Sequence, residues 1–313
     1  MPELRNDPLS GTLVIVAAER AARPHTFPSV TAPAAQPPID CPFCAGHETM
    51  TPPEIARTGA GEPETPGWRV RVVPNLYPVV GGDQAGEGAT GVHEVVVLSP
   101  AHSVSFGRLD DEQATEVLTV MRERVRAHLD AGRSYVQALI NHGVTAGASI
   151  EHPHAQVVAL DLVPPAVELG LARVDAAGHD LVAEAVSRAP DDRLAVIEGP
   201  AVAWCPRASG TPYQIRVAHR STRAAFEAAT DAEVRVVAIA TRDALARLAG
   251  ALGDVPYNLV VRTAPPGRVG FFHWYLDVLP KISVIAGFEQ GTGILVNIVP
   301  PEHAVRRLTE VVP

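Results

Sequence analysis

The feature that most constrains the fold is an internal repeat, in which both halves of the sequence carry the same order of expected elements. Asp110–Ala131 has apolar residues at helical spacing. Thr230–Leu252 has the same spacing about 120 residues later, and Thr230 and Glu233 are placed as a capping box at its start. Short apolar segments typical of strands surround each helix. They are Leu13–Ala17, Glu94–Leu98, Tyr135–Asn141 and Gln156–Leu160 in the first half, and Tyr213–Val217, Tyr257–Arg262 and Trp274–Leu279 in the second.

This repeat predicts an α+β protein whose two similar halves are related by a pseudo-twofold axis. Residues 1–165 form the expected first half and residues 166–313 the second, within one continuous structure. A chain of 313 residues, of which 46% are hydrophobic, is long enough to bury a large core. Prolines cluster in residues 24–53 and 63–78, and we expect long ordered loops there rather than regular structure.

Charge and composition narrow the partners of the protein. The net charge is −9 and the pI is about 5.7, whereas non-specific nucleic-acid binding requires a basic surface. No apolar run reaches the roughly 18 residues that cross a bilayer, and the polar stretch Met1–Asp7 is not a signal peptide. With only three cysteines there is no disulfide framework. We therefore expect a cytoplasmic protein that binds neither nucleic acid nor membrane.

The segment Asn141–Gln156 is the most distinctive motif. It contains the end of a strand, a loop with glycines, two histidines on either side of a proline, and the start of another strand. Because residues two apart on an extended segment point the same way, His152, His154 and Gln156 share one face. An imidazole that is largely neutral near pH 7 is a suitable nucleophile for phosphorus. Two surface histidines flanking a proline in a turn are the alternative interpretation.

The same segment also supplies groups that suit a phosphate. Gly143 and Gly147 allow backbone N–H groups to approach an anion closely, and Ser149 adds a hydroxyl donor. Gln156 is a neutral donor that can hydrogen-bond a non-bridging oxygen as charge redistributes during transfer. The segment therefore predicts attack on phosphorus by a histidine, which forms a covalent intermediate beside a phosphate site.

A cysteine pair predicts a metal site. Cys41 and Cys44 have the CxxC spacing at which two thiolates bind one tetrahedral zinc ion. A redox pair is the alternative, but no strand precedes the cysteines and prolines surround them. A second site built from Cys205, His219 and His273 is doubtful, because these residues include no close pair. Two further ligands are needed for the first site, and the available histidines are His47, His93, His102, His142 and His152.

Two weaker motifs suit a nucleotide. Arg20 and Arg23 lie three residues apart, as suits a diphosphate, although such a pair is usually a solvated surface. Asn75 lies between Pro74 and Pro78 and suits the edge of a base or ribose, with an ordinary turn asparagine as the alternative.

Together these motifs resemble the galactose-1-phosphate uridylyltransferase family, a branch of the histidine-triad superfamily. The resemblance covers nearly the whole chain, and the Asn141–Gln156 segment combined with the cysteine pair is its most specific part. It implies duplicated histidine-triad-like halves with antiparallel sheets and helices packed on one side, the second half being degenerate. The other matching segments are Arg5–Gly11, Glu19–Pro24, Val73–Pro78, Gly91–Glu94, Ser99–His102, Phe272–Trp274, Ala286–Glu289 and Val299–Glu302.

The resemblance implies a role for each candidate residue. His154 is the implied nucleophile, Gln156 supports the phosphoryl group, and Ser149 steadies the leaving phosphate. One structural zinc ion is implied at Cys41, Cys44, His102 and His152. Phosphate contacts are implied for Arg20, Arg23, Asn141 and Gly147, a nucleoside contact for Asn75, and sugar contacts for Phe288 and Glu289, partly across a homodimer.

The implied activity is ping-pong transfer of a nucleoside monophosphate from a nucleoside diphosphate sugar to a sugar-1-phosphate. The sequence departs from the family pattern at three positions, which correspond to contacts with the base, the sugar and a second metal ion. Tyr275 stands where relatives often carry a histidine, Ser283 where a hexose-contacting lysine stands, and Leu76 where an acidic residue stands near the ribose. They leave open a phosphorylase or hydrolase, with phosphate or water as the acceptor. A non-catalytic nucleotide-binding protein is the alternative of another class, which the intact set of His154, Gln156 and Ser149 disfavours.

Overall fold

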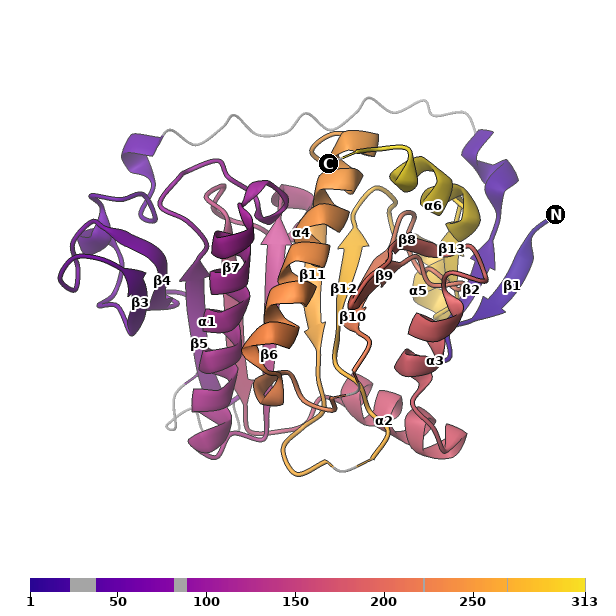
Figure 1. Cartoon of the computed structure of the whole chain (residues 1–313), viewed down its shortest axis with the longest axis horizontal. Coiled ribbons are helices and arrows are strands. Elements are labelled where there is room, and N and C mark those ends of the chain that lie inside the picture. Colours follow the sequence, from indigo (N-terminus) through magenta and orange to yellow (C-terminus); the bar gives the residue numbers. More distant parts are fainter. Residues whose placement is uncertain (23–37, 82–88, 222, 269, 313) are drawn as a thin grey trace.

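A ten-stranded antiparallel sheet forms the centre of the protein (Figure 1). The computed structural model describes residues 1–22, 38–81, 89–221, 223–268 and 270–312. Across the sheet the strand order is β3 (Ala56–Gly59), β4 (Trp68–Pro74), β5 (Gly91–Val97), β7 (His154–Leu160), β6 (Tyr135–His142), β11 (Tyr257–Arg262), β12 (Tyr275–Pro280), β10 (Ile215–His219), β9 (Ala201–Trp204) and β8 (Ala195–Ile197).

The strand order is symmetric about the pairing of β6 with β11 at the centre of the sheet. Leu139 pairs there with Val260. On the two outer sides of this pair, Gln156 of β7 lies opposite Leu139, and Asp277 of β12 lies opposite Val260. The predicted pseudo-twofold arrangement is therefore confirmed, and Gln156 and Asp277 occupy equivalent places. The sheet runs on without a break between the halves, and the division at residue 165 stays a prediction.

Two long helices cover one face of the sheet. They are α1 (Asp111–Asp130), capped by Asp110, and α4 (Asp231–Leu252), which begins with the predicted capping box of Thr230 and Glu233 (Figure 1). On β7, Ala155, Val157 and Ala159 are buried in the core together with residues of both helices. Because side chains alternate along a strand, His154 and Gln156 face away from the helices.

Smaller elements complete the fold. A second sheet is formed by β1 (Glu3–Asn6), β2 (Leu13–Val16) and β13 (Leu295–Asn297), so the first strands of the chain pair with its last. Within the residues that the structure describes, no helix is long and apolar enough to cross a membrane. The remaining helices are α2 (Pro165–Ala177), α3 (Leu181–Arg188), α5 (Gly287–Thr292) and α6 (Pro301–Thr309), with short 3-10 turns between elements.

The proline-rich stretch 63–78 was wrongly predicted to lack regular structure. It contains β4, which lies between β3 and β5. The only proline of β4 is Pro74, its last residue, so the strand interior keeps every backbone donor. The prolines of this stretch thus flank a strand instead of interrupting it.

A buried ion pair joins the small sheet to the second half. Asp7 follows β1, and its two carboxylate oxygens accept hydrogen bonds from Arg216 of β10 at 2.9 and 2.7 Å. Burial alone would raise the pKa of Asp7. The charge and hydrogen bonds of Arg216, together with a hydrogen bond from Ser10, more than offset this and lower that pKa to about 2.

Replacing Asp7 with asparagine is expected to lower the free energy of unfolding by about 3 kcal/mol at neutral pH, because Arg216 then loses its main counter-charge in a buried place. The folded pKa lies below the unfolded value of roughly 3.9. The stability that the ion pair contributes is therefore complete above that value and is lost as the pH falls toward 2. Urea unfolding should give the same difference between the two proteins at about pH 5 and about pH 8.

A matched control removes an ion pair at the surface. Glu116→Gln takes away the partly exposed partner of Arg69 and should change the unfolding free energy far less. An Asp7→Asn effect no larger than that of this control would contradict the prediction, as would a difference that shrinks between about pH 5 and about pH 8.

Candidate active site and metal centre

The four side chains expected to bind a metal ion lie together beside the start of β7. The ligand atoms of Cys41, Cys44, His102 and His152 all lie within 4.8 Å of one another. The sulfur-to-Nδ1 distance is 3.3 Å between Cys44 and His102, and 3.6 Å between His152 and each cysteine. Tetrahedral bonds of zinc to sulfur and nitrogen would place such atoms about 3.6 Å apart. The donor set and its spacing therefore fit a tetrahedral metal ion.

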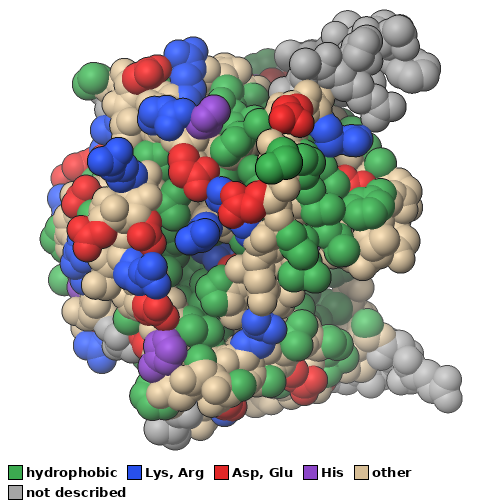
Figure 2. All heavy atoms as spheres, turned by 90° about the vertical axis from the view of Figure 1, so that its right-hand side faces the viewer, with side chains coloured by type: hydrophobic (Ala, Val, Ile, Leu, Met, Phe, Trp, Pro, Cys, Tyr) green, Lys and Arg blue, Asp and Glu red, His purple; other side chains and the backbone are tan. Residues whose placement is uncertain are grey.

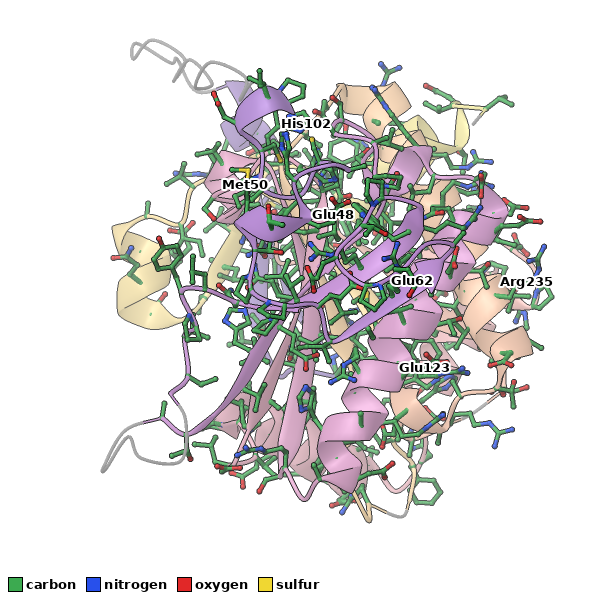
Figure 3. The ribbon with its side chains drawn as sticks, turned by 90° about the vertical axis from the view of Figure 1, so that its left-hand side faces the viewer. Glu48, Met50, Glu62, His102, Glu123 and Arg235 are labelled. Carbon is green, nitrogen blue, oxygen red and sulfur yellow. The ribbon has the colours of Figure 1, made fainter. Side chains whose placement is uncertain are left out.

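Groups around this cluster orient its ligands. His152 donates from Nε2 to the carbonyl oxygen of Ser99 at 2.8 Å, so the lone pair of Nδ1 faces the cysteines. Glu48 accepts hydrogen bonds from the Gly46 N–H and from the Trp68 indole at 2.8 Å, which holds the turn after the cysteines. Figure 3 shows Glu48 and His102 at this end of the molecule.

The charge balance of the cluster favours a cation. Burial raises the pKa of the Cys44 thiol to about 11, and the neighbouring Cys41 adds to the effect. A buried and a partly buried thiolate side by side are unfavourable unless a cation neutralises them, and a bound metal ion would reverse the shift of the thiol pKa.

The other histidines that the sequence left open as ligands are engaged elsewhere. His47 bonds through Nδ1 to the carbonyl oxygen of Cys41, and His142 pairs with Asp254 at 2.7 Å. His93 contacts Gln156. In the described part of the chain, the four-residue cluster is the one group of three or more such ligands close together, so the doubtful second site is not assembled.

His154 opens β7 two residues after the metal ligand His152, and its side chain is buried. It donates from Nδ1 to the carbonyl oxygen of His152 at 2.9 Å, which leaves the lone pair on Nε2. Burial lowers the pKa of His154, so its ring is neutral near pH 7. The ring of Phe43, which lies between the two cysteines, packs against His154 with a centroid distance of 5.3 Å. The metal loop therefore supports an imidazole that can attack phosphorus.

Gln156 lies on the same face of β7 and is linked to the Asn75 loop through His93. Its Oε1 lies 2.9 Å from Nε2 of His93. The amide nitrogen of Asn75 lies 3.2 Å from His93 Nδ1, and its Oδ1 accepts from the Tyr77 N–H. The side chain of Asn75 is thus engaged within the protein, and its predicted contact with a nucleoside stays a prediction.

The end of β6 and the loop between β6 and β7 supply further polar groups. Asn141 accepts at Oδ1 from Asn258 of β11 at 2.7 Å, so its NH2 group remains to donate. Gly147 has a φ of +92°, which favours glycine, and its N–H donates within the turn to Val144. Ser149 is exposed in the same loop. Sequence reasoning missed Asn258, although the repeat places it opposite Asn141.

Some predicted contacts are not brought to His154 within one chain. Arg20 lies in η1 (Ala18–Ala22), directly after β2, and Phe288 and Glu289 lie on α5. In Figure 1, β2, β13 and α5 stand to the right of the sheet and β7 to the left. Arg23 lies outside the described residues.

The second half lacks the chemical groups of the first at the equivalent place. Tyr275 and Asp277 stand on β12 where β7 has His154 and Gln156. A cavity of about 790 Å³ lies over them, and Figure 2 shows a hollow on this side of the molecule with charged side chains among hydrophobic ones. Burial raises the pKa of the Tyr275 phenol to about 12, and the Asp277 carboxylate would repel a phosphoryl group. Strand β12 therefore does not offer the imidazole and amide that β7 presents at the equivalent place.

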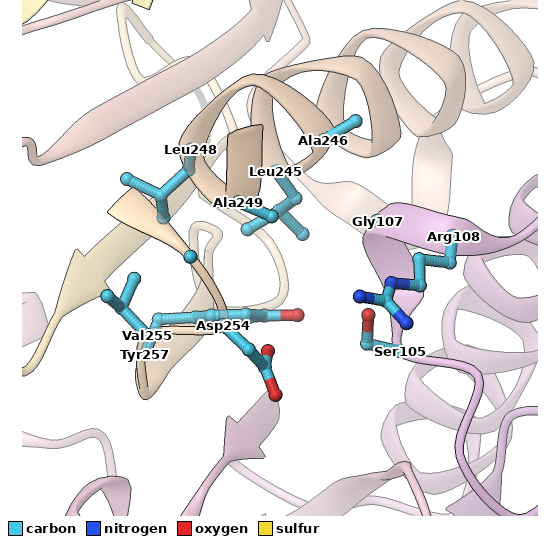
Figure 4. Close-up of a pocket in the computed structure, with 11 residues that line it drawn as sticks. Ser105, Gly107, Arg108, Leu245, Ala246, Leu248, Ala249, Asp254, Val255 and Tyr257 are labelled. Atoms are coloured by element: carbon cyan, nitrogen blue, oxygen red, sulfur yellow. The ribbon is translucent and has the colours of Figure 1, made fainter. Parts of the chain in front are cut away.

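A smaller cavity of about 140 Å³ lies at the end of α4 (Figure 4). Ser105, Arg108, Asp254 and Tyr257 are among its lining residues, and no predicted site residue is. Since small-molecule sites usually span several hundred Å³, this cavity is too small for a nucleotide sugar.

Several known proteins are similar to this chain over nearly its full length. Residues 99–312 match a family model described as a domain of unknown function, DUF4921. The chain is 31% identical over 334 residues to an ADP-glucose phosphorylase of Arabidopsis thaliana, covering 99% of this chain and 93% of the relative. It is 26% identical over 333 residues to a galactose-1-phosphate uridylyltransferase of Thermotoga maritima, covering 99% and 98%. The crystal structure of an ADP-glucose phosphorylase from Arabidopsis thaliana with bound ADP-glucose matches with a TM-score of 0.88 and 30% identity over 100% of both chains.

Proposed function

This chain belongs to the galactose-1-phosphate uridylyltransferase-like family of the histidine-triad superfamily, and we propose that within it the chain is a nucleoside diphosphate sugar phosphorylase that uses ADP-glucose. Sequence reasoning placed a sugar-1-phosphate first as the acceptor and phosphate second. The full-length similarity to an ADP-glucose phosphorylase favours the second. The observation that carries the proposal is the buried, neutral His154, whose Nε2 lone pair lies on the same face as Gln156.

The proposed reaction has two displacements at one phosphorus atom. Nε2 of His154 attacks the phosphorus bonded to adenosine, the bond to the bridging oxygen breaks, and glucose 1-phosphate leaves. An oxygen of inorganic phosphate then attacks the same phosphorus, the phosphorus–nitrogen bond breaks, and ADP leaves. The NH2 groups of Gln156 and Asn141 donate to the oxygens that gain charge, and Ser149 supports the leaving phosphate. Each displacement inverts the configuration at phosphorus, because the nucleophile attacks opposite the leaving group. Inorganic phosphate therefore attacks from the position that glucose 1-phosphate has left.

The metal ion in this proposal is zinc, held by Cys41, Cys44, His102 and His152. With four protein ligands it would have no open position and would supply structure, not a reactive water. The protein itself transmits that structure to the nucleophile, because the carbonyl oxygen of His152 accepts the Nδ1 proton of His154.

The sugar contacts in this proposal come from a second copy of the chain. Phe288 is 49% exposed, and α5 stands away from β7 in its own chain. In a homodimer, Phe288 and Glu289 of one chain would reach the glucose bound to the other, and Arg20 and Arg23 would meet phosphate oxygens. Such an enzyme would act in carbohydrate metabolism.

Intact-mass measurement tests the covalent step and identifies the base. With ADP-glucose and no acceptor, we expect an adenylyl adduct on the wild-type protein, and with UDP-glucose much less adduct. Added phosphate should discharge the adduct as ADP. Absence of an adduct from every donor, with rapid hydrolysis excluded by assaying free AMP and UMP, would leave only a nucleotide-binding role.

A hexose-1-phosphate uridylyltransferase is the second candidate, and the full-length similarity to the Thermotoga maritima enzyme supports it. It predicts the opposite preferences in the same experiment. The adduct would then be uridylyl, and galactose 1-phosphate would discharge it where phosphate does not.

A further inference from the structure

We propose that His93 is a positioning residue that turns the NH2 group of Gln156 toward the reacting phosphoryl group; the inference rests on the proposed function. His93 lies on β5, the neighbour of β7, and its side chain is buried. Its ring lies between the Asn75 loop and Gln156.

The position of the ring proton of His93 follows from the backbone N–H of Val79, which can donate a hydrogen bond but cannot accept one. The backbone N–H of Val79 donates to Nδ1 of His93 at 3.2 Å, so Nδ1 carries a lone pair. The NH2 group of Asn75 lies 3.2 Å from both Nδ1 and Nε2 of His93 and favours neither tautomer, so the Val79 N–H decides the assignment. Burial lowers the pKa of His93, which keeps the ring neutral, and the single ring proton therefore lies on Nε2.

This tautomer decides the orientation of the Gln156 amide. Nε2–H of His93 donates to Oε1 of Gln156 at 2.9 Å. The reversed amide would place an NH2 group against an N–H donor, which is repulsive. The NH2 group of Gln156 consequently points away from His93 and remains available as a donor on the face that it shares with His154. A misplaced donor costs catalysis because its hydrogen bond must meet the charge that develops in the transition state.

The second half of the chain uses the same arrangement with a different residue. In the first half, Val95 pairs with Gln156, and His93 lies two residues before Val95. In the second half, Arg216 pairs with Asp277, the equivalent of Gln156, and Gln214 lies two residues before Arg216. Gln214 accepts from a backbone N–H, that of Gly210, at 2.8 Å and donates to Asp277 at 2.7 Å. A glutamine can therefore do at this place what His93 does in the first half.

That equivalence supplies the rescue variant. His93→Phe keeps an aromatic ring but loses the hydrogen bonds to Val79 and Gln156. We expect the rate of adduct formation to fall about 10- to 100-fold, with little change in KM for ADP-glucose and none in zinc content. His93→Gln should restore most of the rate. Equal losses in the two variants, or no loss in His93→Phe, would overturn the proposal.

A double-mutant cycle separates positioning from packing. In a Gln156→Ala background there is no amide to orient, so adding His93→Phe should lower the rate no further. A second loss of similar size would mean that His93 acts independently of Gln156.

A measurement on the unmodified zinc-loaded protein keeps the proposal testable even if His93→Phe does not fold. Nitrogen-15 NMR of labelled histidine should find the His93 proton on Nε2, and a proton on Nδ1 would overturn the proposal. If the wild-type protein forms no nucleotide adduct, the proposed function fails, while this measurement still decides the hydrogen-bond arrangement.

Discussion

His154→Gly is expected to abolish nucleotidyl transfer, with a loss of at least about 10⁴-fold, while the bound zinc stays unchanged. The variant removes the imidazole that would carry the nucleotide. No metal ligand is touched, because the cluster is made by His152 and three residues distant in the sequence. The backbone carbonyl of His152 that holds His154 is also preserved.

Three measurements test this prediction together: adduct formation by intact mass, product release and zinc content. Tyr275→Phe is the matched control, because Tyr275 occupies the equivalent place in the second half and should not carry the nucleotide. The control should form the adduct as the wild type does. Loss of zinc from His154→Gly, with the adduct retained in His152 variants, would mean that the two histidines have the opposite roles.

Cys41→Ser is expected to release the zinc ion and to lower the free energy of unfolding by more than about 4 kcal/mol. Cys41 is fully buried and shares the cluster with Cys44 and His152. Without the ion, the remaining thiol and imidazoles are left in a buried place with no cation to bind. The loop that carries Phe43 then no longer supports His154, so activity should fall as well.

Thermal unfolding with and without a chelator measures the effect of the metal. The chelator should lower the Tm of the wild type toward that of Cys41→Ser and should leave the variant unchanged. Cys205→Ala is the control, since Cys205 is also buried but lies in the core beneath the sheet, and it should retain zinc. A zinc-free Cys41→Ser protein as stable as the wild type would refute the structural role.

Much of the fold follows from local pattern. The spacing of apolar residues predicted α1 and α4 within a residue at each end, and the capping box at Thr230 is present. β11 matches its prediction, while β10 begins at Ile215 instead of Tyr213, because Tyr213 has a φ of +60°. β4 was not predicted, because prolines cluster on both sides of it although its interior contains none.

The candidate site, like the fold, could be predicted from the sequence only in part. Contiguous motifs, Asn141–Gln156 and the cysteine pair, predicted the nucleophile and two metal ligands from the sequence alone. The sequence could not rank five histidines as partners for the cysteines, and only the resemblance selected His102 and His152. The fold brings these two to the cysteines and engages the others in separate contacts.

The sequence by itself predicted covalent chemistry, because the proposed nucleophile, its supporting amide and the turn glycines lie close together along one strand and loop. The tertiary structure alone decided which residues orient them. His93 and Asn258 reach Gln156 and Asn141 from other strands, and no local spacing relates them. The physical reason is that a strand's period of two sets which side chains share a face, whereas the sheet register sets which strands meet.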